Sequence, residues 1–157
     1  MPAHRLLFFL FALTLLSCGP NFVFQESHPI AEEQWTYADS LAFEVGIDDT
    51  LSRYNFYLDI EHRDSYPYQN LYLRIGTRYP NGQQLKKALS INLADKIGQW
   101  NGKCSGDLCK VRVNLQEKVY FNEVGTYRFV FEQFTRQDSL GGIKQIGFKV
   151  EDIGTLN

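Results

Sequence analysis

The stretch Tyr54–Glu61, which reads YNFYLDIE, decides the fold class of this 157-residue chain. Its apolar residues occupy every second position, and a period of two sends alternate side chains to opposite faces of a β-strand. The same alternation recurs, between turn sequences such as Pro80-Asn81-Gly82, in segments 41–47, 71–76, 89–93, 111–115, 127–132 and 146–151. We therefore predict an all-β domain over residues 40–157. It should be an antiparallel two-sheet β-sandwich of about seven strands, with an immunoglobulin-like or a jelly-roll topology.

The N-terminal segment has the pattern of a bacterial lipoprotein signal. Residues Leu6–Leu16 read LLFFLFALTLL, and a helix of this length spans about 16 Å, roughly half of a bilayer core. The segment ends in LLSC, the pattern that a lipoprotein signal peptidase recognises before a lipidated cysteine, here Cys18. We predict a signal peptide over residues 1–17 and a lipidated N-terminus with a tether over residues 18–39. Because Phe22-Val23-Phe24 and Trp35 are too apolar for a pure linker, we expect part of the tether to dock on the domain. The alternative is an ordinary signal peptide followed by an incidental cysteine.

Composition narrows the possible partners. The formal charge is −2, and removal of Arg5 with the signal peptide makes it −3. A nucleic-acid-binding protein needs a basic stripe, so we expect no nucleic-acid partner. No second apolar segment approaches the roughly 20 residues of a transmembrane helix, so lipid on Cys18 is the expected anchor. Two or three acyl chains on one cysteine hold a protein to a membrane almost permanently.

The two other cysteines, Cys104 and Cys109, follow each other closely. An exported pair of cysteines usually forms a disulfide, and this short loop would stabilise the fold by about 2 kcal/mol. Free thiols or a metal site are the alternatives, although the local sequence offers only Asp107 as a further ligand. We expect no metal and no cofactor.

No motif for catalysis is present. The sequence lacks a nucleophile elbow, a phosphate-binding loop, a dinucleotide fingerprint and a zinc-binding helix motif. His62 has no marked serine or cysteine partner and is interpreted as a solvated histidine at a strand end. A hydrolase would need paired carboxylates, so its test is whether four acids converge in one pocket: Asp59, Glu61, Asp95 and Asp107.

Residues 94–108 interrupt the strand alternation and form the candidate interaction loop. Long loops in compact domains are often functional. The candidate residues are Trp100, Gly102, Gly106 and Asp107. Trp100 either folds back as a plug over one end of the core or projects as an anchor for a partner; we favour the anchor slightly.

The order and spacing of several sequence blocks resemble the GldH family of gliding-motility lipoproteins. These blocks, with the lipoprotein signal, extend over nearly the whole mature chain: 66–73 (YPYQNLYL), 93–107, 125–129 (GTYRF), 132–136 (EQFTR), 140–143 (LGGI) and 147–151 (GFKVE). The chain departs from the family pattern where Cys104 and Cys109 bracket the glycine-rich segment, and at Lys144-Gln145. These departures affect details of the loops and not the family.

The resemblance implies an outer-membrane lipoprotein of the gliding apparatus, acting with other motility and secretion proteins of the envelope. It implies no catalytic residue, cofactor or small-molecule substrate. Gly19 follows the lipidated cysteine and the first acid is Glu26, so an inner-membrane retention signal and a surface-export signal are both missing. We therefore expect the protein to face the periplasm and to act by protein contact. The alternative is an envelope glycan-binding module that uses exposed aromatic residues such as Tyr72 and Trp100.

Overall fold

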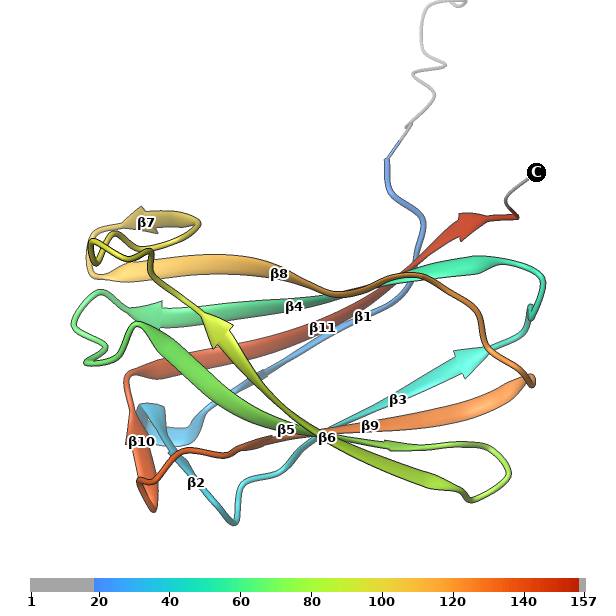
Figure 1. The fold of residues 1–157 in the computed structure, drawn as a ribbon, viewed down its shortest axis with the longest axis horizontal. Coiled ribbons are helices and arrows are strands. Elements are labelled where there is room, and N and C mark those ends of the chain that lie inside the picture. The colour runs from blue at the N-terminus through green and yellow to red at the C-terminus, as the bar shows by residue number, and fades with distance from the viewer. Residues whose placement is uncertain (1–18, 156–157) are drawn as a thin grey trace, which may run out of the picture.

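A computed structural model describes residues 19–155 of the chain (Figure 1). The predicted signal peptide and Cys18 lie outside the described residues. The only helical element described is the short 3-10 turn η1, Ala31–Glu33. The strands are β1 Phe22–Pro29, β2 Gln34–Thr36, β3 Leu41–Ile47, β4 Arg53–Arg63, β5 Asn70–Arg78, β6 Gln84–Asn92, β7 Lys103–Ser105, β8 Leu108–Val119, β9 Gly125–Gln133, β10 Ser139–Gly141 and β11 Ile143–Gly154.

The strands form two antiparallel sheets that pack face to face, as predicted. One sheet has the order β1-β11-β4-β8-β7, the other has the order β3-β9-β5-β6, and β2 pairs with β10 in a separate ribbon. Among the eight long strands, the first pairs with the eighth, the second with the seventh, the third with the sixth and the fourth with the fifth. This nested pairing is a jelly roll, which decides between the two topologies that the alternation left open.

Part of the expected tether docks on the domain, as predicted, and it does so as a strand of the sandwich. β1 lies within it and pairs with β11 along its length, and Asp152 donates a backbone hydrogen bond of 2.9 Å to the Asn21 carbonyl. Phe24 supplies the reason, because its ring packs against Phe43 and Phe148 at centroid distances of 6.2 and 6.1 Å. The sandwich therefore begins at Phe22 rather than at residue 40.

The core between the sheets is dominated by phenylalanine. Phe148 of β11 lies at its centre, and its ring is within 6 Å of the rings of Phe43, Phe56, Phe129 and Phe131. All five side chains are buried. Burial of such rings is the main source of stability in a domain of this size. All buried core residues of the described chain lie between Ile30 and Val150.

The antiparallel strands give the molecule two different ends. The terminal end carries the start of β1, the end of β11 and three short connections, 48–52, 79–83 and 120–124. The long-loop end carries the connections 30–40, 64–69, 93–107 and 134–142, which include β2, β7 and β10. Figure 1 shows the C-terminus at the terminal end on the right and these three short strands on the left.

Candidate functional site

The candidate interaction loop, residues 94–108, covers the core at the long-loop end with the side chain of Trp100. Trp100 pairs with Ala94 in an isolated β-bridge, is partly buried, and its ring lies 4.6 Å from that of His62. Asp95 shapes the loop, because its carboxylate accepts backbone hydrogen bonds from Ile97 and Gln99 at 2.9 and 2.8 Å. This geometry is that of the plug. Trp100 does not project as the exposed anchor that we favoured from sequence.

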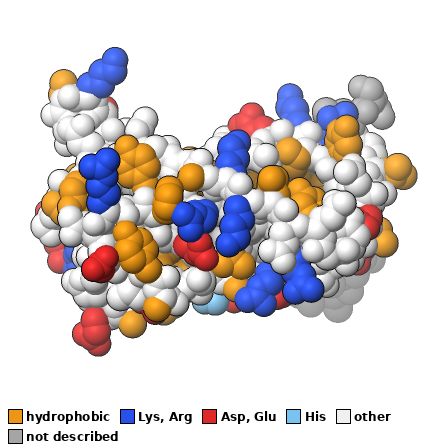
Figure 2. All heavy atoms as spheres, turned by 60° about the horizontal axis from the view of Figure 1, so that its bottom comes forward, with side chains coloured by type: hydrophobic (Ala, Val, Ile, Leu, Met, Phe, Trp, Pro, Cys, Tyr) orange, Lys and Arg blue, Asp and Glu red, His pale blue; other side chains and the backbone are white. Residues whose placement is uncertain are grey.

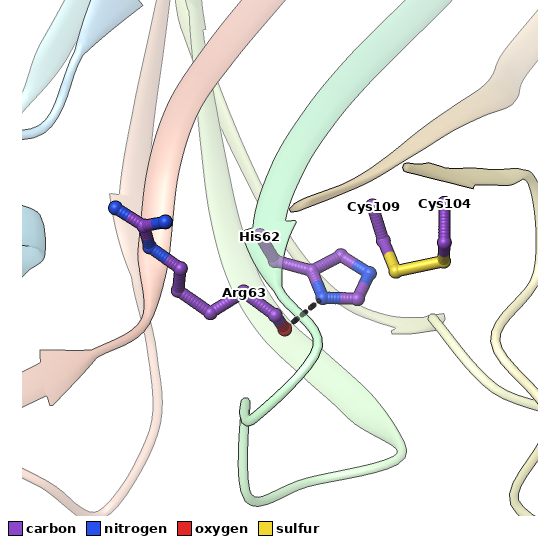
Figure 3. The surroundings of a disulfide bond; sticks show 4 residues. All are labelled: His62, Arg63, Cys104 and Cys109. Carbon is purple, nitrogen blue, oxygen red and sulfur yellow. Dashed lines mark hydrogen bonds between the residues drawn. A yellow bond between two sulfur atoms is a disulfide. The ribbon is translucent and has the colours of Figure 1, made fainter. Parts of the chain in front are cut away.

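His62 is buried beneath Trp100, so the interpretation as a solvated histidine was wrong. Its side chain has no exposed surface, and Nδ1 donates a 2.8 Å hydrogen bond to the Arg63 carbonyl (Figure 3). Burial lowers the pKa of His62, an effect that this hydrogen bond only partly opposes. Nε2 is buried and has no partner among the described residues, so the neutral imidazole is the form that the site accommodates.

A disulfide joins Cys104 of β7 to Cys109 of β8 beside His62 (Figure 3). Two glycines lie at this hairpin, Gly102 just before β7 and Gly106 between the two cysteines. Gly102 has a φ of +96°, and a Cβ on it would lie 2.2 Å from the Lys110 carbonyl oxygen. Gly106 has a φ of +61° but open space around it. These two candidate residues thus have an evident role in shaping the chain.

Asp107 connects this hairpin to the N-terminal part of the domain. Arg63 donates hydrogen bonds to both Asp107 and Glu33, through different guanidinium nitrogens. The hydrogen bonds from Arg63 lower the pKa of Glu33. Exposed ion pairs of this kind contribute little stability each, so Asp107 chiefly fixes the position of the loop.

The four acids that would test for a hydrolase do not share a site. Asp59 accepts hydrogen bonds from Arg112 and pairs with Lys149 at 3.1 Å, and Glu61 pairs with Lys110 at 2.7 Å. Burial alone would raise the pKa of Asp59, but its hydrogen bonds with the two cations outweigh burial and lower it.

The Asp95 carboxylate accepts a hydrogen bond from the Ile97 backbone amide in its own turn, and the Asp107 carboxylate accepts one from Arg63. Neither described pocket is lined by any of the four acids. The described residues also contain no cluster of acids, histidines or cysteines able to hold a metal ion.

Exposed aromatic side chains gather beside the long-loop end, on the outer face of the four-stranded sheet. Tyr37, Tyr72 and Phe134 are 49%, 48% and 43% exposed. The Phe134 amide donates to the Tyr72 carbonyl at 2.9 Å, the Tyr37 hydroxyl donates to the Thr135 carbonyl, and the Arg74 guanidinium lies 4.0 Å from the Phe134 ring centroid. We call Tyr37, Tyr72, Arg74 and Phe134 the aromatic patch.

The alternation of apolar residues predicted that Tyr72 points outward from its strand. It could not predict that Tyr37 and Phe134 lie on the same surface. Both lie in connections between strands, and only the tertiary structure brings them to the same surface. The aromatic patch replaces Trp100 as the candidate contact surface.

Comparison with known proteins identifies the family. The model of the GldH lipoprotein family matches residues 22–150, which span the sandwich from β1 to β11. This chain belongs to the GldH lipoprotein family. A gliding motility lipoprotein GldH homolog of Christiangramia forsetii is 29% identical over 95% of this chain and 96% of its own length. The gliding motility lipoprotein GldH of Flavobacterium johnsoniae is 25% identical over 89% and 91%.

Membership confirms the predicted resemblance and identifies this chain as a gliding-motility lipoprotein. Within residues 19–155 no helix is long and apolar enough to span a bilayer. The family is not a known enzyme family.

Proposed function

We propose that this GldH-family protein works at the outer membrane, facing the periplasm, and binds another envelope protein of the gliding machinery without catalysis. The observation that supports this best is the aromatic patch. Tyrosine and arginine are enriched at the energetic centres of protein interfaces. Four of the six sequence blocks that resemble the family begin or end at the long-loop end of the sandwich, beside the aromatic patch. These are blocks 66–73, 93–107, 132–136 and 140–143.

The position of the lipidated cysteine supports an orientation in which this patch points away from the membrane. Only Gly19, Pro20 and Asn21 separate Cys18 from β1, and three extended residues reach about 10 Å. Lipid on Cys18 would therefore hold the terminal end close to the membrane. The eleven residues of β4 extend over about 36 Å at 3.3 Å per residue, so the long-loop end would stand that far from the membrane surface.

Protein contact fits the aromatic patch better than glycan stacking. A sugar ring needs a free aromatic face, and Arg74 covers one face of Phe134. Trp100, the other residue considered for a glycan, packs against His62. Arg74 also pairs with Glu132 at 3.7 Å, and its remaining guanidinium N–H groups can hydrogen bond a partner's backbone or carboxylates.

The contact is tested with full-length Tyr72→Ala and Phe134→Ala variants expressed at normal abundance. Because these side chains are half exposed, we expect thermal midpoints within a few degrees of wild type. Each change should weaken partner binding by about 2 kcal/mol, the size of a hot-spot effect, and gliding should fall accordingly. Val23→Ala is the control, since Val23 is 45% exposed on β1 and lies away from the aromatic patch.

Normal gliding in both patch variants would refute the contact. Binding of wild-type protein to purified envelope glycans, lost in Tyr72→Ala, would favour the glycan-binding alternative. The anchor has its own test: Cys18→Ala should abolish lipid transfer and remove the protein from the outer-membrane fraction. Retention of that variant in the fraction, with normal gliding, would show that something other than the lipid positions the protein.

A further inference from the structure

An apolar groove runs between the edge strand β6 and the part of β8 that lies beyond its pairing with β7, at the side of the sandwich away from β1. Its volume is about 530 Å³, within the range of small-molecule sites. Leu85 and Leu89 line it on the β6 side, and Val113 and Leu115 line it on the β8 side. At its floor lie four buried phenylalanines of the core, Phe56, Phe129, Phe131 and Phe148.

The groove exists because the sandwich closes on one side only. At the opposite side Phe24 of β1 packs on Phe43 of β3 and covers the core. Between β6 and β8 the apolar residues remain partly exposed, and Leu85 is 55% exposed. An apolar surface of this kind, open to solvent in a small domain, marks a binding site.

The lining favours an aliphatic chain as the occupant. Most of the floor is hydrocarbon, from the four phenylalanines and from Ile75 and Ile91. The polar side chains lie mainly along β8 and the connection after it (Asn114, Gln116 and Asn122), with Ser90 on β6 and Thr77 on β5. A ligand with polar groups along its length would leave those groups without partners on the floor, which is costly. A hydrocarbon chain meets no such penalty.

Charge at the rim favours an anionic head group. Lys87 of β6 is the lysine that lines the groove. Among the described residues Lys87 forms no ion pair, whereas Lys110 and Arg112 of β8 are paired with Glu61 and Asp59. Figure 2 shows this side hollowed at its upper edge, with Lys and Arg side chains standing around hydrophobic ones.

The groove also lies next to the expected membrane surface. It extends to Tyr79, Tyr120 and Phe121 at the terminal end, the end where Cys18 precedes β1. Leu51 and Val124 in the neighbouring connections of that end are 79% and 58% exposed. A protein held there by lipid would bring the groove within reach of the acyl chains of the membrane.

A partner's β-strand is the competing occupant, and the β8 edge fits it poorly. The register of β8 against β4 shifts between Asn114 and Val119, and Lys118 has a φ of +55°. Bulges and charged residues on an edge strand are features that prevent further strand pairing.

From these observations we propose that the groove between β6 and β8 binds one acyl chain of an anionic membrane phospholipid. Lys87 would meet the phosphate. This inference rests on the anchoring through Cys18 proposed above, and it is independent of the aromatic patch at the other end.

The experiment uses full-length lipidated protein in vesicles of phosphatidylethanolamine and phosphatidylglycerol. A trace of the phosphatidylglycerol carries a photoactivatable diazirine at the end of one acyl chain. After illumination, mass spectrometry of the digested protein should find the lipid on groove residues such as Leu89, Val113 and Leu115. Flotation of the protein with the vesicles reports the anchoring separately, so its failure is distinguishable from failure of the groove.

Leu85→Glu is the test variant, because it places a charge at the mouth of the groove on a side chain that is already half exposed. It should lower groove labelling at least fivefold at an unchanged thermal midpoint. Ala88→Glu is the matched control: it adds the same charge to the same strand at a position that does not line the groove, and labelling should persist. Lys87→Gln should reduce labelling by this probe more than labelling by a zwitterionic phosphatidylcholine probe.

Three results would overturn the proposal. The first is lipid found only on Leu51, Tyr120 or Val124, which means contact with the membrane surface alone. The second is groove labelling that is equal in wild type and Leu85→Glu. The third comes from cells with a photoreactive amino acid at position 115: a protein adduct there in place of a lipid adduct would assign the groove to a partner's strand.

Discussion

Replacement of Trp100 by alanine separates a structural plug from an interaction anchor. The ring packs 4.6 Å from His62 and 6.5 Å from Tyr66, and Trp100 joins Ala94 in a β-bridge. Truncation of a buried tryptophan costs about 3–5 kcal/mol. Because Trp100 is only partly buried, we expect the lower limit, about 3 kcal/mol. For a domain of this size, that loss lowers the thermal midpoint by roughly 12 °C.

The assay is thermal unfolding followed by circular dichroism, on the chain that begins at Gly19 and contains the complete core. Ile97→Ala is the control in the same loop, because Ile97 is 84% exposed and its truncation should change stability by less than about 0.5 kcal/mol. A Trp100→Ala protein that melts within about 2 °C of wild type while full-length Trp100→Ala cells fail to glide would refute the plug. Such a result would restore Trp100 as a contact residue.

Three further perturbations test the surroundings of Trp100. Alkylation of the mature protein without reductant should modify neither Cys104 nor Cys109, and full labelling of both thiols would contradict the disulfide. Cys104→Ser should lower the free energy of unfolding in denaturant by about 1–3 kcal/mol and leave the sandwich folded. Gly102→Ala should lower the free energy of unfolding by about 3 kcal/mol, because a side chain there combines a positive φ with a clash against backbone. Gly106→Ala should lower it by about 1 kcal/mol, and equal losses would contradict this account of Gly102. Burial lowers the pKa of His62 below its usual 6.5, so the unfolded chain binds a proton that the folded chain rejects, and stability is complete above about pH 6.5 and falls as the pH is lowered toward 5. His62→Phe should remove that decline between pH 7 and pH 5, and a decline of the same size in the variant would show that other groups cause it.

Local sequence determined the strands of this protein and the class of its fold. Alternation in Tyr54–Glu61 and in the other segments reports which face of a strand is buried, and this property depends only on neighbours along the chain. The same reasoning expected this segment to dock but did not predict β1 as a strand, because Phe22, Val23 and Phe24 are consecutive apolar residues and residues 25–28 are polar. Backbone pairing with β11 makes that segment a strand, and such pairing cannot be seen in the periodicity of the sequence.

Long-range contacts decided the candidate site. Trp100 and His62 are 38 positions apart, and neither local sequence shows that each buries the other. The aromatic patch combines residues of three separate segments, and the groove between β6 and β8 depends on which edges of the two sheets remain uncovered. The sequence alone determined strands, a predicted lipid anchor and a family resemblance. Only the tertiary structure decided the jelly-roll pairing and the surfaces left open for binding, because these depend on contacts between segments far apart in the chain.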